Sequence, residues 1–227
     1  MLPELICPTD DGRGLPGQPV PLLLWRLPDP LCAISSAPAG GGIGLRTWVM
    51  NATVPMTYAN TDPEAHLGEL AARRGLAGAG VGMLTGVDVA DRVVASDGGV
   101  VVTATVGIGT PTWAADDCGV GVAGGIGTIN VVVVVPVRLT EAALVNVVST
   151  VAEAKAQALW SLGVEGTGTA TDAVCVLCPP AGRSECFGGP RSRWGSRVAR
   201  AVHAALLDGG GRWLASGVAW SCKTFLT

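Results

Sequence analysis

One continuous stretch, residues 124–178, restricts the fold of this chain more than any other. It opens with a β-branched run flanked by glycines at residues 128–137, which predicts a buried strand. A long helical pattern follows over residues 139–162, and Thr171–Cys178 form a second short apolar run. A strand, a helix and a strand with short connections make a βαβ unit, whose strands are normally parallel. The sequence therefore predicts an α/β (mixed α+β) fold with a βαβ unit at residues 126–178.

The predicted helix has clear ends and one residue that does not fit its pattern. Thr140 is the expected N-cap, Glu141 complements the helix dipole, and Gly163 follows the last apolar residue as a C′ glycine. Lys155 projects into the middle of the apolar face, where its ammonium group needs an ionic partner, a wet cavity or a path to solvent. Glu153 lies on the other side of the helix, in a polar stripe that is typical of a solvated face.

Lys155 also falls at a defined level of the predicted unit. The rise per residue of helices and strands places it beside Asn130, and in a parallel arrangement residues 166–172 return to the same edge. We therefore expect either a polar pocket at this edge or a Lys155 that runs along the sheet beside a simple turn. In the first case seven residues converge: Thr128, Asn130, Lys155, Thr167, Thr169, Thr171 and Asp172.

The rest of the chain predicts one layered sheet-and-helix domain. Strands are expected at residues 20–27, 31–36, 45–54, 81–89 and 99–108, and helices at residues 62–74 and 196–207. Pro21 suggests that the first of these strands lies at a sheet edge. We expect a flexible lead-in at residues 1–19, a single domain at residues 20–208 and a C-terminal tail at residues 209–227.

Composition excludes several classes of protein. Hydrophobic residues make up 48% of the chain and charged residues 15%, which argues for a well-buried core. The net charge of −3 comes without a basic face, so nucleic acid is not an expected partner. The first residues lack the features of a signal peptide, and the longest apolar run is shorter than the roughly 20 residues of a membrane helix. We expect a soluble, cytoplasmic protein with no membrane association.

No metal or cofactor motif passes its context test. The seven cysteines are scattered, and Cys175-x-x-Cys178 is only half of a zinc site, with its two thiols on opposite faces of a strand. Gly119-x-Gly121-x-x-Gly124 matches the dinucleotide pattern, but a strand rather than a helix is predicted after it. A nucleotide-binding protein is therefore disfavoured, and no metal or cofactor is expected.

Few residues are available for catalysis. His66 and His203 are the only histidines, and both are expected on helix surfaces, so a Ser-His-Asp triad is disfavoured. Acid–base chemistry would fall to carboxylates, to a desolvated Lys155 or to a threonine nucleophile. Asp172 beside Lys155 could equally form a structural ion pair or a catalytic one.

The short motifs of this chain are more specific as an ordered series than any one of them is alone. In series come SS…GGG (35–42), VMNATVPMTY (49–58), VGMLTG (81–86), TATVG (103–107), GTIN (127–130), EAALVN (141–146), AEAKAQAL (152–159) and TGTATDA (167–173). Together they resemble the adenosylcobinamide amidohydrolase family of cobalamin salvage. The resemblance implies hydrolysis of the amide that joins the corrin ring's propionate arm to aminopropanol, giving adenosylcobyric acid.

The resemblance also implies a set of site residues around a corrinoid substrate. Glu153 or Asp172 would act as the base, and Lys155, Asn130 and the backbone amides of residues 166–171 would stabilise the oxyanion. A covalent intermediate on Thr169 or Thr171 is left open. The glycine-rich segments 40–44 and 119–127 are expected as rims of an open cleft. Expected substrate-binding residues are Thr128, Thr167, Thr169, Thr171, Gly41, Gly42 and Asn51. A non-catalytic corrinoid-binding or regulatory domain is the alternative function, and the oligomeric state is open.

Overall fold

The computed structural model describes residues 1–6, 21–117 and 127–216. Its sheet has eight strands in the order β4-β3-β2-β8-β7-β6-β5, with β1 paired to β2. The strands are β1 (Glu4–Ile6), β2 (Leu22–Ser35), β3 (Gly42–Thr53), β4 (Gly80–Thr85), β5 (Val93–Asp97), β6 (Val100–Val106), β7 (Ile129–Val134) and β8 (Ala173–Cys178). The helices are α1 (Pro63–Arg73), α2 (Glu141–Ser161) and α3 (Gly195–Ser216), with a short 3₁₀ turn at Val89–Asp91.

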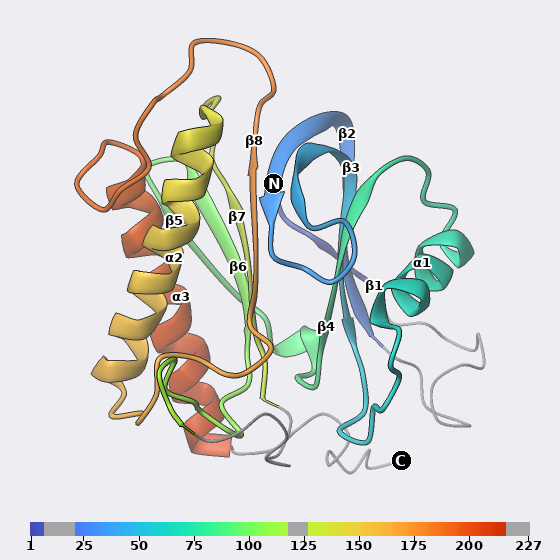
Figure 1. Ribbon diagram of the computed structural model, residues 1–227, viewed down its shortest axis with the longest axis vertical. Helices are drawn as coiled ribbons and strands as arrows, with labels where there is room; N and C mark the ends of the chain where they lie inside the picture. The colour runs from blue at the N-terminus through green and yellow to red at the C-terminus, as the bar shows by residue number, and fades with distance from the viewer. Residues whose placement is uncertain (7–20, 118–126, 217–227) are drawn as a thin grey trace.

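The long strand β2 divides this sheet into two layers that face each other. Its first half pairs with β1 and its second half with β8, while β3 follows it throughout. The register slips between Arg26 and Leu31, where β2 turns from one layer into the other. Figure 1 shows β1–β4 on one side, β5–β8 on the other, and helices on both outer faces.

Three apolar clusters hold these layers together. The first lies between β5–β8 and the helices α2 and α3, with Val133, Leu144 and Val202 fully buried in it. The second lies between the two sheet layers and contains Trp25 and Leu177. The third lies between β2–β4 and α1. Each layer of the sheet is therefore buried on both faces, which accounts for the continuous apolar runs of its strands.

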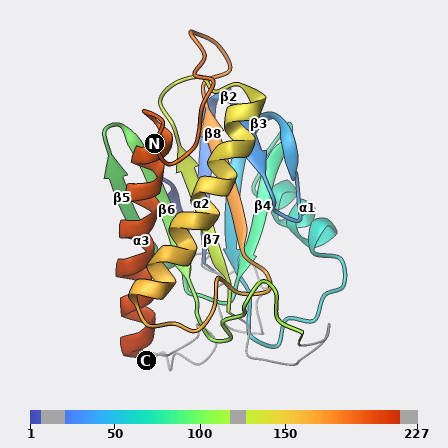
Figure 2. The ribbon, with the colours of Figure 1, turned by 60° about the vertical axis from the view of Figure 1, so that its left-hand side comes forward.

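The structure confirms the predicted βαβ unit. β7 and β8 are parallel neighbours, and α2 connects them across the outer face of that layer beside α3 (Figure 2). Thr140 caps α2 by accepting from the backbone N–H of Ala143 at 3.2 Å, and Gly163 follows the helix with φ of 71°. None of the helices in the described ranges has the length and apolar character that crossing a bilayer requires.

The prediction of an edge strand at residues 20–27 is wrong. The two runs expected at residues 20–27 and 31–36 form one interior strand, β2, with neighbours on both sides. Pro21 lies just before Leu22, the first strand residue, where no ladder donor is needed, and its carbonyl accepts from the N–H of Thr53 at 3.1 Å. β4 also ends earlier than predicted, at Thr85.

The last helix is longer than predicted. α3 continues from the expected end at residue 207 to Ser216, so residues 209–216 are helical rather than part of a tail. Gly209 and Gly210 are buried, and a Cβ atom on Gly209 would lie 2.7 Å from Val106. These glycines therefore allow close packing of the helix on the sheet instead of ending the helix. The expected lead-in likewise contributes a strand, β1.

Candidate functional site

A cleft of about 510 Å³ opens between the two sheet layers. Its walls come from the ends of β3 and β4, the starts of β7 and β8, and the segment that leads into α1. The lining residues are Ser36, Pro38, Val54, Tyr58, Asn60, Pro63, Leu84, Thr85, Gly86, Thr128, Asn130, Ala170, Thr171, Asp172 and Ala173. Its volume falls within the range of small-molecule sites.

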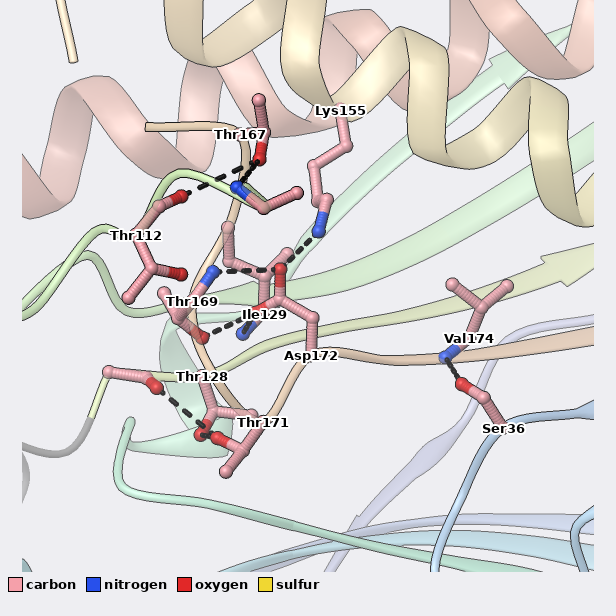
Figure 3. A network of polar contacts seen from close by, with 12 residues as sticks. Ser36, Thr112, Thr128, Ile129, Lys155, Thr167, Thr169, Thr171, Asp172 and Val174 are labelled. Atoms are coloured by element: carbon pink, nitrogen blue, oxygen red, sulfur yellow. Dashed lines mark hydrogen bonds and ion pairs between the residues drawn. The ribbon is translucent and has the colours of Figure 1, made fainter. Parts of the chain in front are cut away.

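Asp172 connects the elements that meet at this edge. Its Oδ2 accepts from Lys155 Nζ and from the backbone N–H of Thr169 at 3.0 Å. Its Oδ1 accepts from the backbone N–H of Ile129 at 3.0 Å and from the hydroxyl of Thr169. Figure 3 shows the carboxylate between α2 and the start of β7. Four donors fill the usual capacity of a carboxylate, so Asp172 holds the loop before β8 in place and has no free oxygen for a proton.

Lys155 therefore has the ionic partner that its place on an apolar helix face demands. The side chains of Lys155 and Asp172 are 16% and 10% exposed. Gly168 makes this contact possible, because a Cβ atom there would collide with both Lys155 Nζ and Asp172 Oδ2. Lys155 itself does not line the cleft, so it acts on the site through Asp172.

The four candidate threonines divide into two groups. Thr128 and Thr171 line the cleft, and their hydroxyl oxygens are 2.8 Å apart. Thr169 binds Asp172, and the Thr167 hydroxyl accepts from the backbone N–H of Ala114 at 3.1 Å. Two threonines thus face the cleft and two fix the loops behind it.

Asn130, the second residue of β7, lines the cleft and is only 2% exposed. Its Nδ2 donates to Asn51 Oδ1 and to the carbonyl of Leu84, both at 2.9 Å. Asn51 in turn donates to the hydroxyl of Thr105 at 3.0 Å. Both amide hydrogens of Asn130 are used, so the oxyanion-donor role expected for it lacks a free N–H. The free atom is instead the acceptor Oδ1, which is buried and has no partner among the described residues.

Four other candidates do not line the cleft. Asn51 is buried and is not among the lining residues. Glu153 is exposed on α2. Gly41, in the connection between β2 and β3, and Gly42, the first residue of β3, are both exposed. The guanidinium of Arg46 donates to the carbonyls of Gly40 and Gly41. The Gly119–Gly124 motif, and most of the expected rim at residues 119–127, lie outside the described residues.

Tyr58 lines the cleft although no sequence pattern predicted it, and its partner, His66, was expected on a helix surface. The Tyr58 hydroxyl lies 2.8 Å from His66 Nδ1, with the two rings stacked. Burial lowers the pKa of His66, and burial together with the charge of Asp62 raises the pKa of Tyr58. The signal was the helix start at Asp62-Pro63, because it places His66 in the first turn of α1, facing the segment that precedes it.

The cysteine pair behaves as core rather than as a metal site. Cys175 lies between the sheet layers and Cys178 beneath α2, on opposite faces of β8 as predicted. Burial raises the pKa of Cys175 to about 12 and that of Cys178 to about 11. Across the part of the chain that the structure describes, no cluster of three or more metal-ligating side chains is found.

Comparison with known proteins gives consistent matches. The family model described as adenosylcobinamide amidohydrolase matches residues 13–217. A protein of that name from Methanosarcina mazei is 31% identical over 158 residues, which cover 70% of this chain and 73% of the relative. Another of that name, from Halobacterium salinarum, is 35% identical over 130 residues, which cover 55% of each chain.

Proposed function

The chain belongs to the adenosylcobinamide amidohydrolase family, and we propose that it hydrolyses the amide joining the corrin ring's propionate arm to aminopropanol in adenosylcobinamide. Water adds across the C–N bond, so that the arm leaves as a carboxylate and the other part as an amine. The acid product, adenosylcobyric acid, then re-enters cobalamin synthesis. The matched residues include every described element that lines the cleft, and this observation carries the proposal. We place the reaction in the cytoplasm.

The cleft suits one arm of the substrate rather than the whole corrinoid. Its volume of about 510 Å³ is small for a corrin ring that also carries an adenosyl group. The ring would rest outside, while the propionate arm with its amide enters between the sheet layers. Polar groups stand inside an otherwise largely apolar lining, at Thr128, Asn130 and Thr171, as expected where a few groups orient a ligand.

The contacts support a division of roles among the candidate residues. Asp172 and Lys155 act as positioning residues, since their contact fixes the loop that carries Thr171. Thr171 presents its hydroxyl at the cleft, held by Thr128. It is the candidate either to attack the carbonyl, its proton passing to the nitrogen that leaves as the amine and water later cleaving the ester, or to bind the water that attacks directly. A trapped acyl-enzyme on Thr171, detected by mass spectrometry, would decide between these two mechanisms.

The direct test is release of aminopropanol from adenosylcobinamide by the purified protein. Thr171→Val removes the hydroxyl while keeping the shape, and we expect it to lower kcat by roughly 100-fold or more. Thr171→Ser should restore a large part of the activity. Ser161→Ala, which removes an exposed hydroxyl on α2, is the matched control. Full activity of Thr171→Val would refute the role of Thr171, and absence of release by the wild type would refute the activity.

A corrinoid-binding domain without chemistry is the second candidate, and one observation favours it. Asp172 has both oxygens occupied and Glu153 is exposed away from the cleft, so neither expected base faces the amide. Binding seen as a spectral shift of the corrinoid, with no aminopropanol released, would select this function.

A further inference from the structure

The side-chain oxygen of Asn130, Oδ1, has a defined orientation and no hydrogen-bond partner among the described residues. One of its Nδ2 contacts is the backbone carbonyl of Leu84, which only accepts, so the NH₂ group must face Leu84 and Oδ1 must point the other way. The second Nδ2 hydrogen is donated to Asn51. A flipped side chain would leave two oxygens facing each other, so the assignment follows from chemistry.

The residue that carries this unpaired oxygen lines the cleft. In the described residues four buried side-chain polar atoms lack a partner: Trp25 Nε1, Asn130 Oδ1, Trp194 Nε1 and His203 Nε2. Of these four residues, Asn130 alone lines the cleft. Buried polar groups are seldom left unpaired in proteins, so an unpaired acceptor on a residue that lines a ligand-sized cleft points to a donor supplied by the ligand.

The atom is also held rigidly by both layers of the sheet. Asn130 is on β7, Asn51 on β3, Thr105 on β6, and the Leu84 carbonyl belongs to β4. Four strands therefore fix the carboxamide plane. Donation of both Nδ2 hydrogens draws electron density toward Oδ1, which strengthens it as an acceptor.

We propose that Asn130 Oδ1 accepts the N–H of the amide bond that is cleaved, and so positions the substrate. The inference rests on the proposed function, because a secondary amide carries one N–H, located at the reacting bond. In a trans amide the N–H and C=O bonds point in opposite directions. An N–H held at Asn130 therefore turns the carbonyl away from this oxygen and into the cleft.

The same contact discriminates between substrate and product. Hydrolysis replaces the N–H on the corrinoid side by a carboxylate oxygen, which would meet the lone pairs of Asn130 Oδ1. The acid product is therefore repelled where the amide is attracted. A site built around a buried acceptor rejects ligands that lack the donor, because the acceptor is then left unpaired.

The test compares the amide with an ester analogue in which oxygen replaces the nitrogen of the reacting bond. In the wild type the amide gains the contact and the ester meets a repulsion. In Asn130→Ala both effects vanish, so the amide-to-ester ratio of kcat/KM should fall by at least roughly tenfold. Asn146→Ala, an exposed asparagine on α2, is the control and should leave the ratio unchanged.

A structural role for Asn130 would lower both rates equally and leave their ratio intact, and a folded variant with an unchanged ratio overturns the inference. Thermal melts verify folding, and Asn130→Ser serves if Asn130→Ala does not fold. Rapid spectral titration of the wild type needs no variant: equal affinities for amide and ester would also overturn the inference. Absence of aminopropanol release, by contrast, refutes the proposed function, while the titration still tests the contact.

Discussion

The Nζ atom of Lys155 on α2 contacts the Oδ2 atom of Asp172, 17 positions later in the chain, and so closes the βαβ unit at one edge. The contact joins the apolar face of a helix to the loop that lines the cleft. Three further hydrogen bonds converge on the same carboxylate, two from Thr169 in the loop before β8 and one from Ile129 at the start of β7.

The two partners of this ion pair should differ in their effect on stability. Lys155→Met leaves Asp172 with three donors, and we expect the free energy of unfolding to fall by about 2–3 kcal/mol. Asp172→Asn removes the counter-charge of Lys155 and turns an NH₂ group toward N–H donors. Its free energy of unfolding should therefore lie about 1–2 kcal/mol below that of Lys155→Met. Urea unfolding of both variants measures the difference.

The double variant Lys155→Met/Asp172→Asn measures the coupling free energy between the two side chains, because it removes both partners together. We expect it to be less destabilised than the sum of the single variants. Arg200→Met, which breaks the exposed pair with Asp97, is the control and should unfold close to the wild type. Additive losses at residues 155 and 172 would mean that the contact contributes nothing.

Gly168 offers a second way to disturb the same contact without removing either charge. An added Cβ would displace Lys155 Nζ and Asp172 Oδ2, so Gly168→Ala should lower stability by about 1–3 kcal/mol. Gly68→Ala is the matched control, because its Cβ would meet no atom within 4 Å on the exposed face of α1. Replacement of a helical glycine there should raise stability by up to about 1 kcal/mol. Equal melting temperatures for the two variants would contradict the packing at Gly168.

Local rules were enough for the βαβ unit and its polar edge. The cap at Thr140, the glycine at residue 163 and the period of α2 follow from short-range patterns. Lys155 could be placed beside the start of β7 because helix and strand rises are fixed numbers. Parallel strands then brought Asp172 to the same edge.

Contacts between the sheet layers could not be read from local patterns. The run Pro28-Asp29-Pro30 reads as a break, yet β2 continues through it and changes layer, because β3 stays paired on either side. The pairing of Asn51 with Asn130 depends on that change, as does the cleft lined by Tyr58. Asp172 was expected as a possible base. Its occupied carboxylate could not be foreseen, because two of the donors are the backbone N–H groups of residues 129 and 169.

His66 should make stability depend on pH below neutrality. Burial holds the pKa of His66 below its ordinary 6.5, so between the two values the unfolded chain binds a proton that the folded protein does not. Stability from this residue is therefore complete above pH 6.5 and is lost as the pH falls below that value. We expect melting temperatures measured between pH 5 and pH 8 to fall less steeply on acidification in His66→Gln than in the wild type. Identical profiles would contradict the burial of this imidazole.

Cysteine labelling should separate the core from the surface. Burial raises the pKa of Cys175 to about 12, so at pH 8 roughly one thiol in ten thousand is ionised. The native protein should therefore react with iodoacetamide at the exposed Cys186 while Cys175 stays unlabelled, as read by peptide mass spectrometry. In denaturant the two should label alike. Fast native labelling of Cys175 would show that β8 opens readily.

Glu153 gives the sharpest contrast between the family-based expectation and the geometry. A general base must come within hydrogen-bonding reach of the proton it removes. Loss of such a base typically lowers the rate by about 100-fold to 10,000-fold. Glu153 is exposed on α2, outside the cleft lining, and makes no hydrogen bond or ion pair with the residues that the structure describes. We therefore expect Glu153→Gln to keep kcat/KM for adenosylcobinamide within about threefold of the wild type, whereas Thr171→Val loses most of it. A loss of roughly 100-fold in Glu153→Gln, with an unchanged melting temperature, would instead show that the polar face of α2 takes part in the reaction.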